Sequence, residues 1–112
     1  MDITVTDRDG ARIISVVGSV DASTAETLTE ELKKLIDQGK ACLVADFTQV
    51  DYISSAGLRS LLATVKEARN QGGDLLLASV TGDVQKVLKL SGFTSIIKIY
   101  PDVNAALSSL GS

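Results

Sequence analysis

The sequence predicts an α/β domain, a mixed β-sheet of four or five strands with about four helices packed on it. Short apolar runs of strand length alternate with segments whose apolar residues recur at helical spacing, which is typical of parallel strand–helix–strand units. The pair Asp9-Gly10 separates the first two β-branched runs and indicates an antiparallel hairpin. A chain of 112 residues fits one domain over residues 1–112.

The first two strands are predicted on either side of Asp9-Gly10. Residues 3–6 alternate apolar and polar side chains, as a half-buried strand does. Residues 12–17 are rich in β-branched side chains, and Gly18 is expected to end this strand. The remaining strands are short runs dominated by apolar residues, as in the buried part of a sheet: residues 41–47, 74–78 and 95–99.

Four helices are predicted from apolar residues that recur every three or four positions. The first begins at a capping-box pattern, Ser23 followed by Glu26, and ends at Gly39. The second opens at Ser54-Ser55 and ends before Gly72-Gly73, the third ends at Gly92, and the fourth follows Pro101-Asp102. The expected inward faces are Ala25, Leu28, Leu32, Leu35 and Ile36; Leu58, Leu61, Leu62, Val65 and Ala68; Val84, Val87, Leu88 and Leu90; and Val103, Ala106, Leu107 and Leu110.

Composition excludes several classes of function. A net charge of −3 argues against a nucleic-acid or anionic-membrane binder, and 4% aromatic residues without Trp argue against base stacking. The absence of histidine removes the Ser-His-Asp and Cys-His arrangements, most zinc sites and a pH switch near neutrality. No cofactor and no metal are therefore expected, and a catalytic role is disfavoured.

Local motifs add no catalytic or metal chemistry. Asp7-x-Asp9-Gly10 resembles the start of a calcium loop, but Arg12 stands where that loop needs glycine. The chain has neither a GxGxxG nor a Walker A motif. Asp46 and Asp51 are interpreted as loop and cap residues rather than as an acid–base pair.

Targeting signals are not found in the sequence. The start of the chain lacks the basic and apolar regions of a signal peptide, and no run approaches the ~20 apolar residues of a membrane helix. The second residue, Asp2, also excludes N-myristoylation, so a cytoplasmic protein without a membrane partner is expected. The lone cysteine, Cys42, lies in an apolar run and is predicted to be a buried core thiol.

The segment 46–58 carries the strongest functional signal. A buried strand ends, a short loop follows, and a helix opens at Ser54-Ser55. A serine at a helix start is normally an N-cap. However, sites in α/β proteins gather at the carboxyl ends of central strands, and the small residues here leave the helix start open. A phosphate at this position would meet free N–H groups and the positive end of the helix dipole, so both interpretations stay open.

These residues resemble the signature of the anti-sigma factor antagonist family, also called anti-anti-sigma factors, which are small stand-alone STAS domains. That signature runs from an Asp at a strand end, through a Val and an aromatic, to Asp/Ser-Ser-Ser/Thr/Ala-Gly-Leu. The matching residues here are Asp46, Val50, Tyr52 and Ser54-Ser55-Ala56-Gly57-Leu58. Three further stretches fit in the right order: Gly18-Ser19-Val20-Asp21-Ala22-Ser23-Thr24-Ala25, Gly72-Gly73 and Leu90-Ser91-Gly92-Phe93.

The resemblance implies a STAS fold and a partner switch. The unphosphorylated protein would bind an anti-sigma factor serine/threonine kinase and thereby free a sigma factor. Phosphorylation by that kinase at Ser55 would break the complex, and a serine phosphatase of the PP2C type would reset it. Ser54 stands where the family often has Asp and is the second choice for the phosphate. The protein itself is then not an enzyme, and ATP and magnesium belong to the kinase.

The expected partner-binding surface joins the loop before Ser55 to the loop that contains Asp21. Asp21 is either a helix cap or a partner contact, and the contact is favoured because Ser23 supplies a capping box. The expected partner-binding residues are Asp21, Ala22, Ser23, Ser54, Ser55, Ala56, Gly57 and Leu58.

Two other classes of function stay open. One is a STAS scaffold module that is never phosphorylated and serves a signalling or secretion assembly. The other is a small-molecule or nucleotide-binding module, against which the missing phosphate-binding glycine motif argues.

Overall fold

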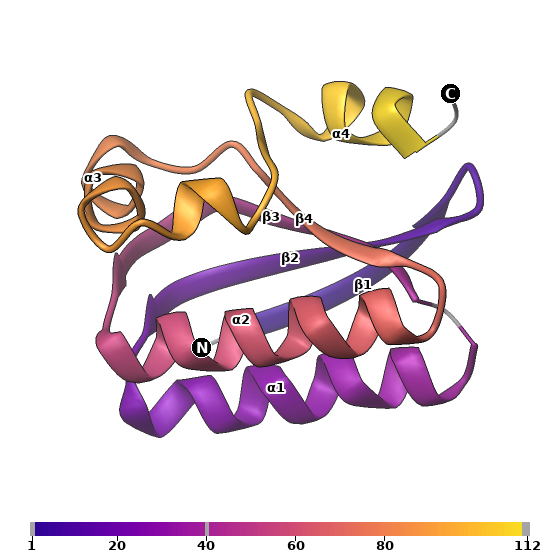
Figure 1. The fold of residues 1–112 in the computed structure, drawn as a ribbon, viewed down its shortest axis with the longest axis horizontal. Helices are drawn as coiled ribbons and strands as arrows, with labels where there is room; N and C mark the ends of the chain where they lie inside the picture. Colours follow the sequence, from indigo (N-terminus) through magenta and orange to yellow (C-terminus); the bar gives the residue numbers. More distant parts are fainter. Residues whose placement is uncertain (1, 40, 111–112) are drawn as a thin grey trace.

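The computed structural model describes residues 2–39 and 41–110 and shows a five-stranded mixed sheet with four α-helices in these residues (Figure 1). The strands are β1 (Asp2–Arg8), β2 (Ala11–Val20), β3 (Cys42–Ile53), β4 (Asp74–Ala78) and β5 (Ile99–Tyr100). The helices are α1 (Ala22–Asp37), α2 (Ser55–Asn70), α3 (Gly82–Leu90) and α4 (Val103–Leu110), with a 3-10 helix, η1 (Phe93–Ser95). The predicted α/β class is confirmed.

The sheet follows the order of the sequence, β1-β2-β3-β4-β5. β1 is antiparallel to β2, and the other neighbours are parallel. Asp9 and Gly10 have φ values of 54° and 83°, which suits a tight hairpin turn because its central residues need positive φ. The turn places Arg8 opposite Ala11, so the predicted hairpin is confirmed.

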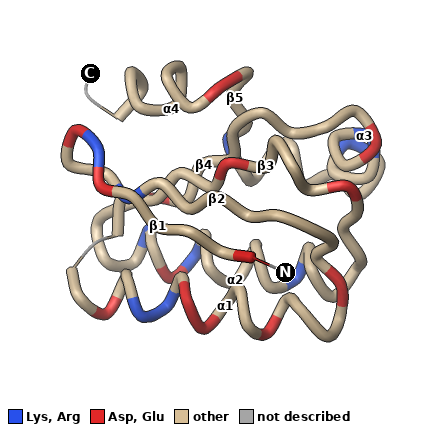
Figure 2. Tube along the Cα trace, turned by 180° about the vertical axis from the view of Figure 1, so that it is seen from behind, with Lys and Arg blue, Asp and Glu red and all other residues tan. Residues whose placement is uncertain are grey.

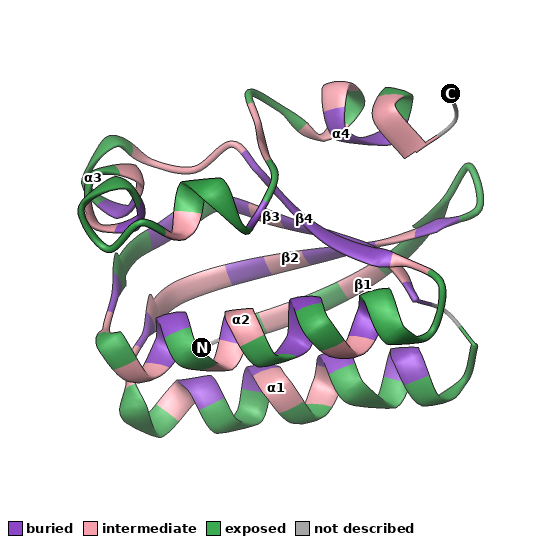
Figure 3. Cartoon of the chain, in the orientation of Figure 1, coloured by how far each residue is buried: buried purple, intermediate pink, exposed green. Residues whose placement is uncertain are grey.

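The helices cover both faces of the sheet. α1 and α2 lie side by side along one face, and α4 covers the opposite face (Figure 1). Side chains along β3 point alternately to the two faces of the sheet. Leu43 and Ala45 belong to the larger core with α1 and α2, whereas Val44 packs with Ala106 of α4 on the other face. Figure 3 shows the resulting buried stripes on the inner sides of α1 and α2.

The predicted inward faces of α1, α2 and α4 are largely confirmed. In α2, however, Leu62 is only half-buried and Thr64 is buried in its place. The Thr64 hydroxyl donates to the Ser60 carbonyl at 2.8 Å, so its burial leaves no unsatisfied donor. In α4, Ala106 and Leu107 are buried, while Val103 and Leu110 pack partly buried against the same cluster.

The strands β2 and β3 are both longer than predicted. β2 continues past Gly18, whose positive φ of 113° lies at an irregularity of the pairing rather than at the end of the strand. β3 continues through the predicted loop to Ile53. Its register against β2 shifts twice, so that β3 contains extra residues that β2 does not oppose, as in β-bulges. The core-facing residues in this part of β3 are therefore three positions apart instead of two: Phe47, Val50 and Ile53.

Two predictions near the carboxyl end are wrong. Leu90 is 83% exposed, because it lies about 240° around α3 from Val84, whereas Leu88, four residues from Val84, is buried. The strand predicted at residues 95–99 is only Ile99–Tyr100, since residues 93–95 form a 3-10 turn. In that turn the hydroxyl and the backbone N–H of Ser95 both donate to the Gly92 carbonyl. Both donors of Ser95 therefore have a hydrogen-bond partner without strand pairing.

The prediction that Cys42 is a buried core thiol is also wrong. Its side chain is half-buried at the start of β3, where it packs against the cluster under α4.

Acidic and basic residues both occur along α1 and α2, so neither helix is purely basic (Figure 2). In residues 2–39 and 41–110 every helix is too short or too polar for a transmembrane span. In the same residues no three His, Cys, Asp or Glu side chains gather into a metal site.

Candidate functional site: the paired starts of α1 and α2

The candidate site lies where two neighbouring parallel strands end and each leads into a helix. Val20, the last residue of β2, is paired with Ile53, the last residue of β3. Just beyond them, the Ser54 backbone N–H donates to the Val20 carbonyl at 2.9 Å. The starts of α1 and α2 are therefore adjacent, as the left side of Figure 1 shows. The two loops that the sequence analysis joined into one surface do lie together.

Asp21 is the N-cap of α1. Its Oδ1 accepts hydrogen bonds from the backbone N–H groups of Ser23 at 2.9 Å and Thr24 at 3.1 Å. In return, the Thr24 hydroxyl oxygen accepts from the Asp21 N–H at 2.9 Å, which completes a capping box. The capping box predicted at Ser23 is therefore wrong by two residues, and the argument that left Asp21 free for a partner no longer holds.

The same contacts set the charge of Asp21. Hydrogen bonds from the Ser23 hydroxyl and from the N–H groups of Thr24 and Ser23 hold the pKa of the Asp21 carboxyl below its usual value. They favour the ionised form, because each donor points at an oxygen that carries negative charge. Asp21 is thus a fixed anion at the edge of the candidate site, while Ala22 and Ser23 beside it are exposed.

Ser54 and Ser55 have different tasks at the start of α2. Ser54 is the N-cap, and its Oγ accepts from the Gly57 N–H at 3.1 Å. Ser55 is the first residue of the helix and is exposed, and its hydroxyl has no hydrogen bond to another described residue. The first turn contains no acidic side chain. Ser55 therefore presents a free hydroxyl to solvent, whereas the hydroxyl of Ser54 is half-buried and engaged.

The first turn of α2 packs directly against the end of β2. A Cβ atom on Gly57 would lie 2.7 Å from the Val20 carbonyl oxygen, closer than real Cβ atoms approach. Leu58 is 5% exposed and belongs to the main core. Gly57 and Leu58 thus hold the helix start in place and offer a partner little surface, whereas Ala56 remains half-exposed.

Three residues at the ends of β2 and β3 were not among the expected partner-binding residues: Ser19, Asp51 and Tyr52. The Ser19 hydroxyl donates to Asp51 Oδ1 at 3.0 Å, which links the two strands. The neighbouring Tyr52 is 53% exposed, an unusual state for a large aromatic side chain. The sequence analysis expects a loop at Asp51 and Tyr52, where the structure has strand. The β-branched and aromatic residues of Val50, Tyr52 and Ile53 are typical of strands and were the available signal.

The carboxylates Asp46 and Asp51 do not act as a pair. Asp46 accepts from the hydroxyl and the N–H of Thr48, and Asp51 accepts from Ser19. Each therefore has its own donor, Asp46 within β3 and Asp51 across to β2, so the predicted hydrogen-bonding role is confirmed. Their surroundings are strand rather than loop.

A comparison with protein-family models matches residues 2–106 to the model described as the STAS domain. The chain belongs to the STAS domain family. The match spans the sheet, all of α1, α2 and α3, and the start of α4, so the candidate site lies well inside this STAS domain.

Curated relatives and solved structures agree with this assignment. This STAS domain is 37% identical over 109 residues to BtrV of Bordetella bronchiseptica, named as a candidate anti-sigma factor antagonist, with 97% of this chain and 94% of BtrV covered. It is 26% identical to the anti-sigma-F factor antagonist RsfB of Mycobacterium tuberculosis, with 96% and 88% covered. A crystal structure from Thermotoga maritima has the same fold, with a TM-score of 0.92, 20% identity, and 98% and 95% covered.

Proposed function

We propose that this STAS domain is an anti-sigma factor antagonist that works by partner switching. Its unphosphorylated form binds an anti-sigma factor serine/threonine kinase and so releases a sigma factor. Phosphorylation at Ser55 by that kinase breaks the complex, and a serine phosphatase of the PP2C type restores the binding form. The names of the curated relatives support the general role, and the kinase, the phosphatase and the modified residue are the proposal's own content.

The observation that carries the proposal is the contrast between the two serines of α2. Ser55 is exposed, and its hydroxyl forms no hydrogen bond with another residue that the structure describes, whereas the Ser54 hydroxyl caps the helix. A kinase must bring a hydroxyl into line with the phosphate of ATP, and only a hydroxyl that reaches solvent allows this without unfolding of the helix start. Ser55 is therefore preferred over Ser54 as the acceptor.

The helix start is also suited to carry the phosphate once it is attached. Of the first backbone N–H groups of α2, Gly57 donates to the Ser54 side chain and Leu58 to the Ser54 carbonyl at 2.9 Å. The N–H groups of Ser55 and Ala56 have no described acceptor, so they are available to an anion. The helix dipole adds roughly 0.3–1 kcal/mol in favour of a negative charge there.

The penalty of phosphorylation therefore falls on the complex rather than on the fold. A phosphoserine adds roughly −1.5 to −2 charges and three acceptor oxygens to an edge that already has the carboxylates of Asp21 and Asp51. A partner surface fitted to a neutral hydroxyl would meet this bulk and charge, which at an interface costs several kcal/mol. The exposed residues Ala22 and Ser23 at the start of α1 and Tyr52 near the end of β3 complete the proposed contact surface.

The test uses anti-sigma serine kinases encoded by neighbouring genes. Wild type, its phosphorylated form, Ser55→Ala and Ser55→Asp are titrated against the kinase by calorimetry, and the phosphate is located by mass spectrometry. We expect one phosphate at Ser55 and a loss of at least ~100-fold in affinity on phosphorylation, because ~1.4 kcal/mol corresponds to tenfold. Ser55→Asp should show part of this loss, and Ser55→Ala should bind and resist inactivation.

A phosphate found on Ser54 would contradict the assignment of the acceptor. Equal affinity of the phosphorylated and unphosphorylated forms would contradict the switch and leave the STAS scaffold module as the better account.

A further inference from the structure

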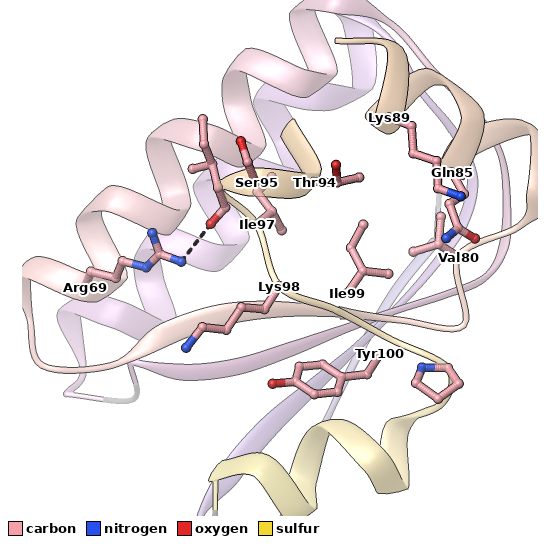
Figure 4. A pocket seen from close by; sticks show the side chains of 12 residues that line it. Arg69, Val80, Gln85, Lys89, Thr94, Ser95, Ile97, Lys98, Ile99 and Tyr100 are labelled. Atoms are coloured by element: carbon pink, nitrogen blue, oxygen red, sulfur yellow. Dashed lines mark hydrogen bonds between the residues drawn. The ribbon is translucent and has the colours of Figure 1, made fainter. Parts of the chain in front are cut away.

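A hollow of about 650 Å³ lies between α3, η1 and β5 (Figure 4). This volume is in the usual range of small-molecule sites, roughly 300–1,000 Å³. Its apolar lining includes Val80, Ile97 and Ile99, and none of its lining residues belongs to the paired starts of α1 and α2. The hollow is therefore separate from the proposed partner surface.

The hollow has a strongly positive lining in a chain whose net charge is −3. Arg69, Lys89 and Lys98 line it, and no carboxylate does. Behind them, Asp74 forms ion pairs with Arg69 Nε at 3.0 Å and with Lys98 Nζ at 3.5 Å. Three positive charges and one negative charge leave a local charge of +2.

Two further carboxylates, Asp83 and Asp102, neither line the hollow nor form ion pairs with its cations. Asp83, on the same helix as Lys89, does not line the hollow. Asp102 accepts from the Ala105 N–H at 2.8 Å and so caps the start of α4. Among the described residues, Asp74 is the carboxylate that forms ion pairs with these cations, and Lys89 has no ion pair.

Polar donors are placed at both ends of the apolar lining. Arg69 is held by its bond to Asp74 and by donation from Nη2 to the Ile96 carbonyl at 2.8 Å. Figure 4 shows Lys89 on one side of the hollow and Lys98 with the Tyr100 phenol on the other. The Tyr100 hydroxyl has no hydrogen bond to another described residue. An elongated anion that lies over Ile99 would find donors at each end.

We propose that this hollow binds a small organic phosphate of the phosphate monoester class. A phosphate monoester carries roughly −1.5 to −2 charges at neutral pH. Arg69, Lys98 and Asp74 give one end of the hollow a net charge of +1, and Lys89 adds a further positive charge at the other end. The phosphate lies among Arg69, Lys98 and the Tyr100 hydroxyl, and the apolar part of the ligand covers Ile99 and Val80 toward Lys89. The site needs no glycine-rich loop, so the missing glycine motif does not argue against it.

The probe is phenyl phosphate, which combines a phosphate monoester with an apolar ring. It is titrated into the ¹⁵N-labelled protein, with inorganic phosphate and phenol as separate controls. We expect saturable amide shifts at Lys89 and residues 94–100, tighter binding of phenyl phosphate than of either control, and weaker binding as salt is added. Lys89→Gln and Lys98→Gln should each weaken binding up to about fivefold, as expected for exposed charge pairs.

The matched control is Lys86→Gln, which removes the same charge from the same helix outside the hollow. It should bind phenyl phosphate like the wild type. Absence of saturation, an equal loss for Lys86→Gln, inorganic phosphate binding as tightly as phenyl phosphate, or shifts confined to residues 54–57 would each overturn the proposal. The experiment uses the isolated protein without a kinase, so its failure is distinct from a failure of the partner switch.

Discussion

The backbone N–H of Ser54 donates a 2.9 Å hydrogen bond to the carbonyl oxygen of Val20, which joins the ends of β2 and β3 directly. Both groups belong to the main chain, so the contact does not depend on which side chain occupies position 54 or 55. The relative placement of the two helix starts is therefore expected to survive substitution of either serine. Effects on partner binding can then be separated from effects on the fold.

Ser54→Ala and Ser55→Ala should differ in stability although they remove neighbouring hydroxyls. Ser54→Ala removes the side chain that accepts from the Gly57 N–H, so we expect a loss of about 1 kcal/mol in the free energy of unfolding. Ser55→Ala removes an exposed hydroxyl without a described partner, so its change should stay within about 0.5 kcal/mol. Urea denaturation of both variants measures this, and equal losses would contradict the assignment of the cap.

Gly57→Ala should destabilise the protein by about 1–3 kcal/mol. The new Cβ would lie 2.7 Å from the Val20 carbonyl oxygen, a backbone atom that cannot turn away. The control is Gly82→Ala, at the start of α3, where a Cβ meets nothing within 4 Å, so it should be neutral or stabilising. Thermal and urea denaturation compare the two. A neutral Gly57→Ala would mean that α2 shifts freely on β2.

The stability contributed by Asp21 should depend on pH. Its folded-state pKa is lowered, so the contribution is fully present above the unfolded value near pH 4 and is lost as pH falls through the folded value. The substitution Asp21→Asn keeps a capping oxygen but removes the group that ionises. The stability gap between wild type and variant should therefore shrink as the pH is lowered from 6 to about 2. A gap that stays constant over this range would show that the charge makes no contribution.

Tyr52→Ala should weaken kinase binding at least about tenfold while it leaves stability nearly unchanged. The side chain is 53% exposed near the end of β3, three residues before Ser55, and aromatic residues supply much of the binding energy at many interfaces. Leu90→Ala is the control, since it removes an even more exposed apolar side chain from α3, outside the proposed surface. Equal binding by wild type and Tyr52→Ala would remove Tyr52 from that surface.

Elements with strong local signals could be predicted from the sequence. Asp9-Gly10 needs positive φ at both positions, and the apolar stripes of α1 and α2 repeat over four turns, so neither depends on distant contacts. The five residues of β4 are all buried, and the four apolar residues that follow Asp74 indicate a buried strand. Local chemistry decides these elements, and the structure agrees with the prediction.

Several features that the sequence analysis predicted wrongly or missed depend on contacts that a short sequence pattern does not report. Asp21 and Ser23 are both good cap residues, and the choice is made where the Thr24 hydroxyl donates to the Ser19 carbonyl at 2.7 Å. The length of β3 follows from its pairing with β2 through Ile53, which no local pattern reports. The basic hollow is assembled from α2, α3 and the segment before α4, so it has no sequence motif.

The two register shifts between β2 and β3 restrict how the chain can change in length. Between the pairs Ser15–Asp46 and Val20–Ile53, β3 advances by seven residues and β2 by five. Side chains alternate between the two faces of a strand, so two extra residues bring the chain back to the same face. Val20 and Ile53 therefore both point into the core. Deletion of one residue between Asp46 and Ile53 would turn the end of β3 over and point Ile53 to solvent. Insertions and deletions in this stretch should therefore be tolerated only in pairs, and even a pair would move Ser55 along the sheet relative to Asp21.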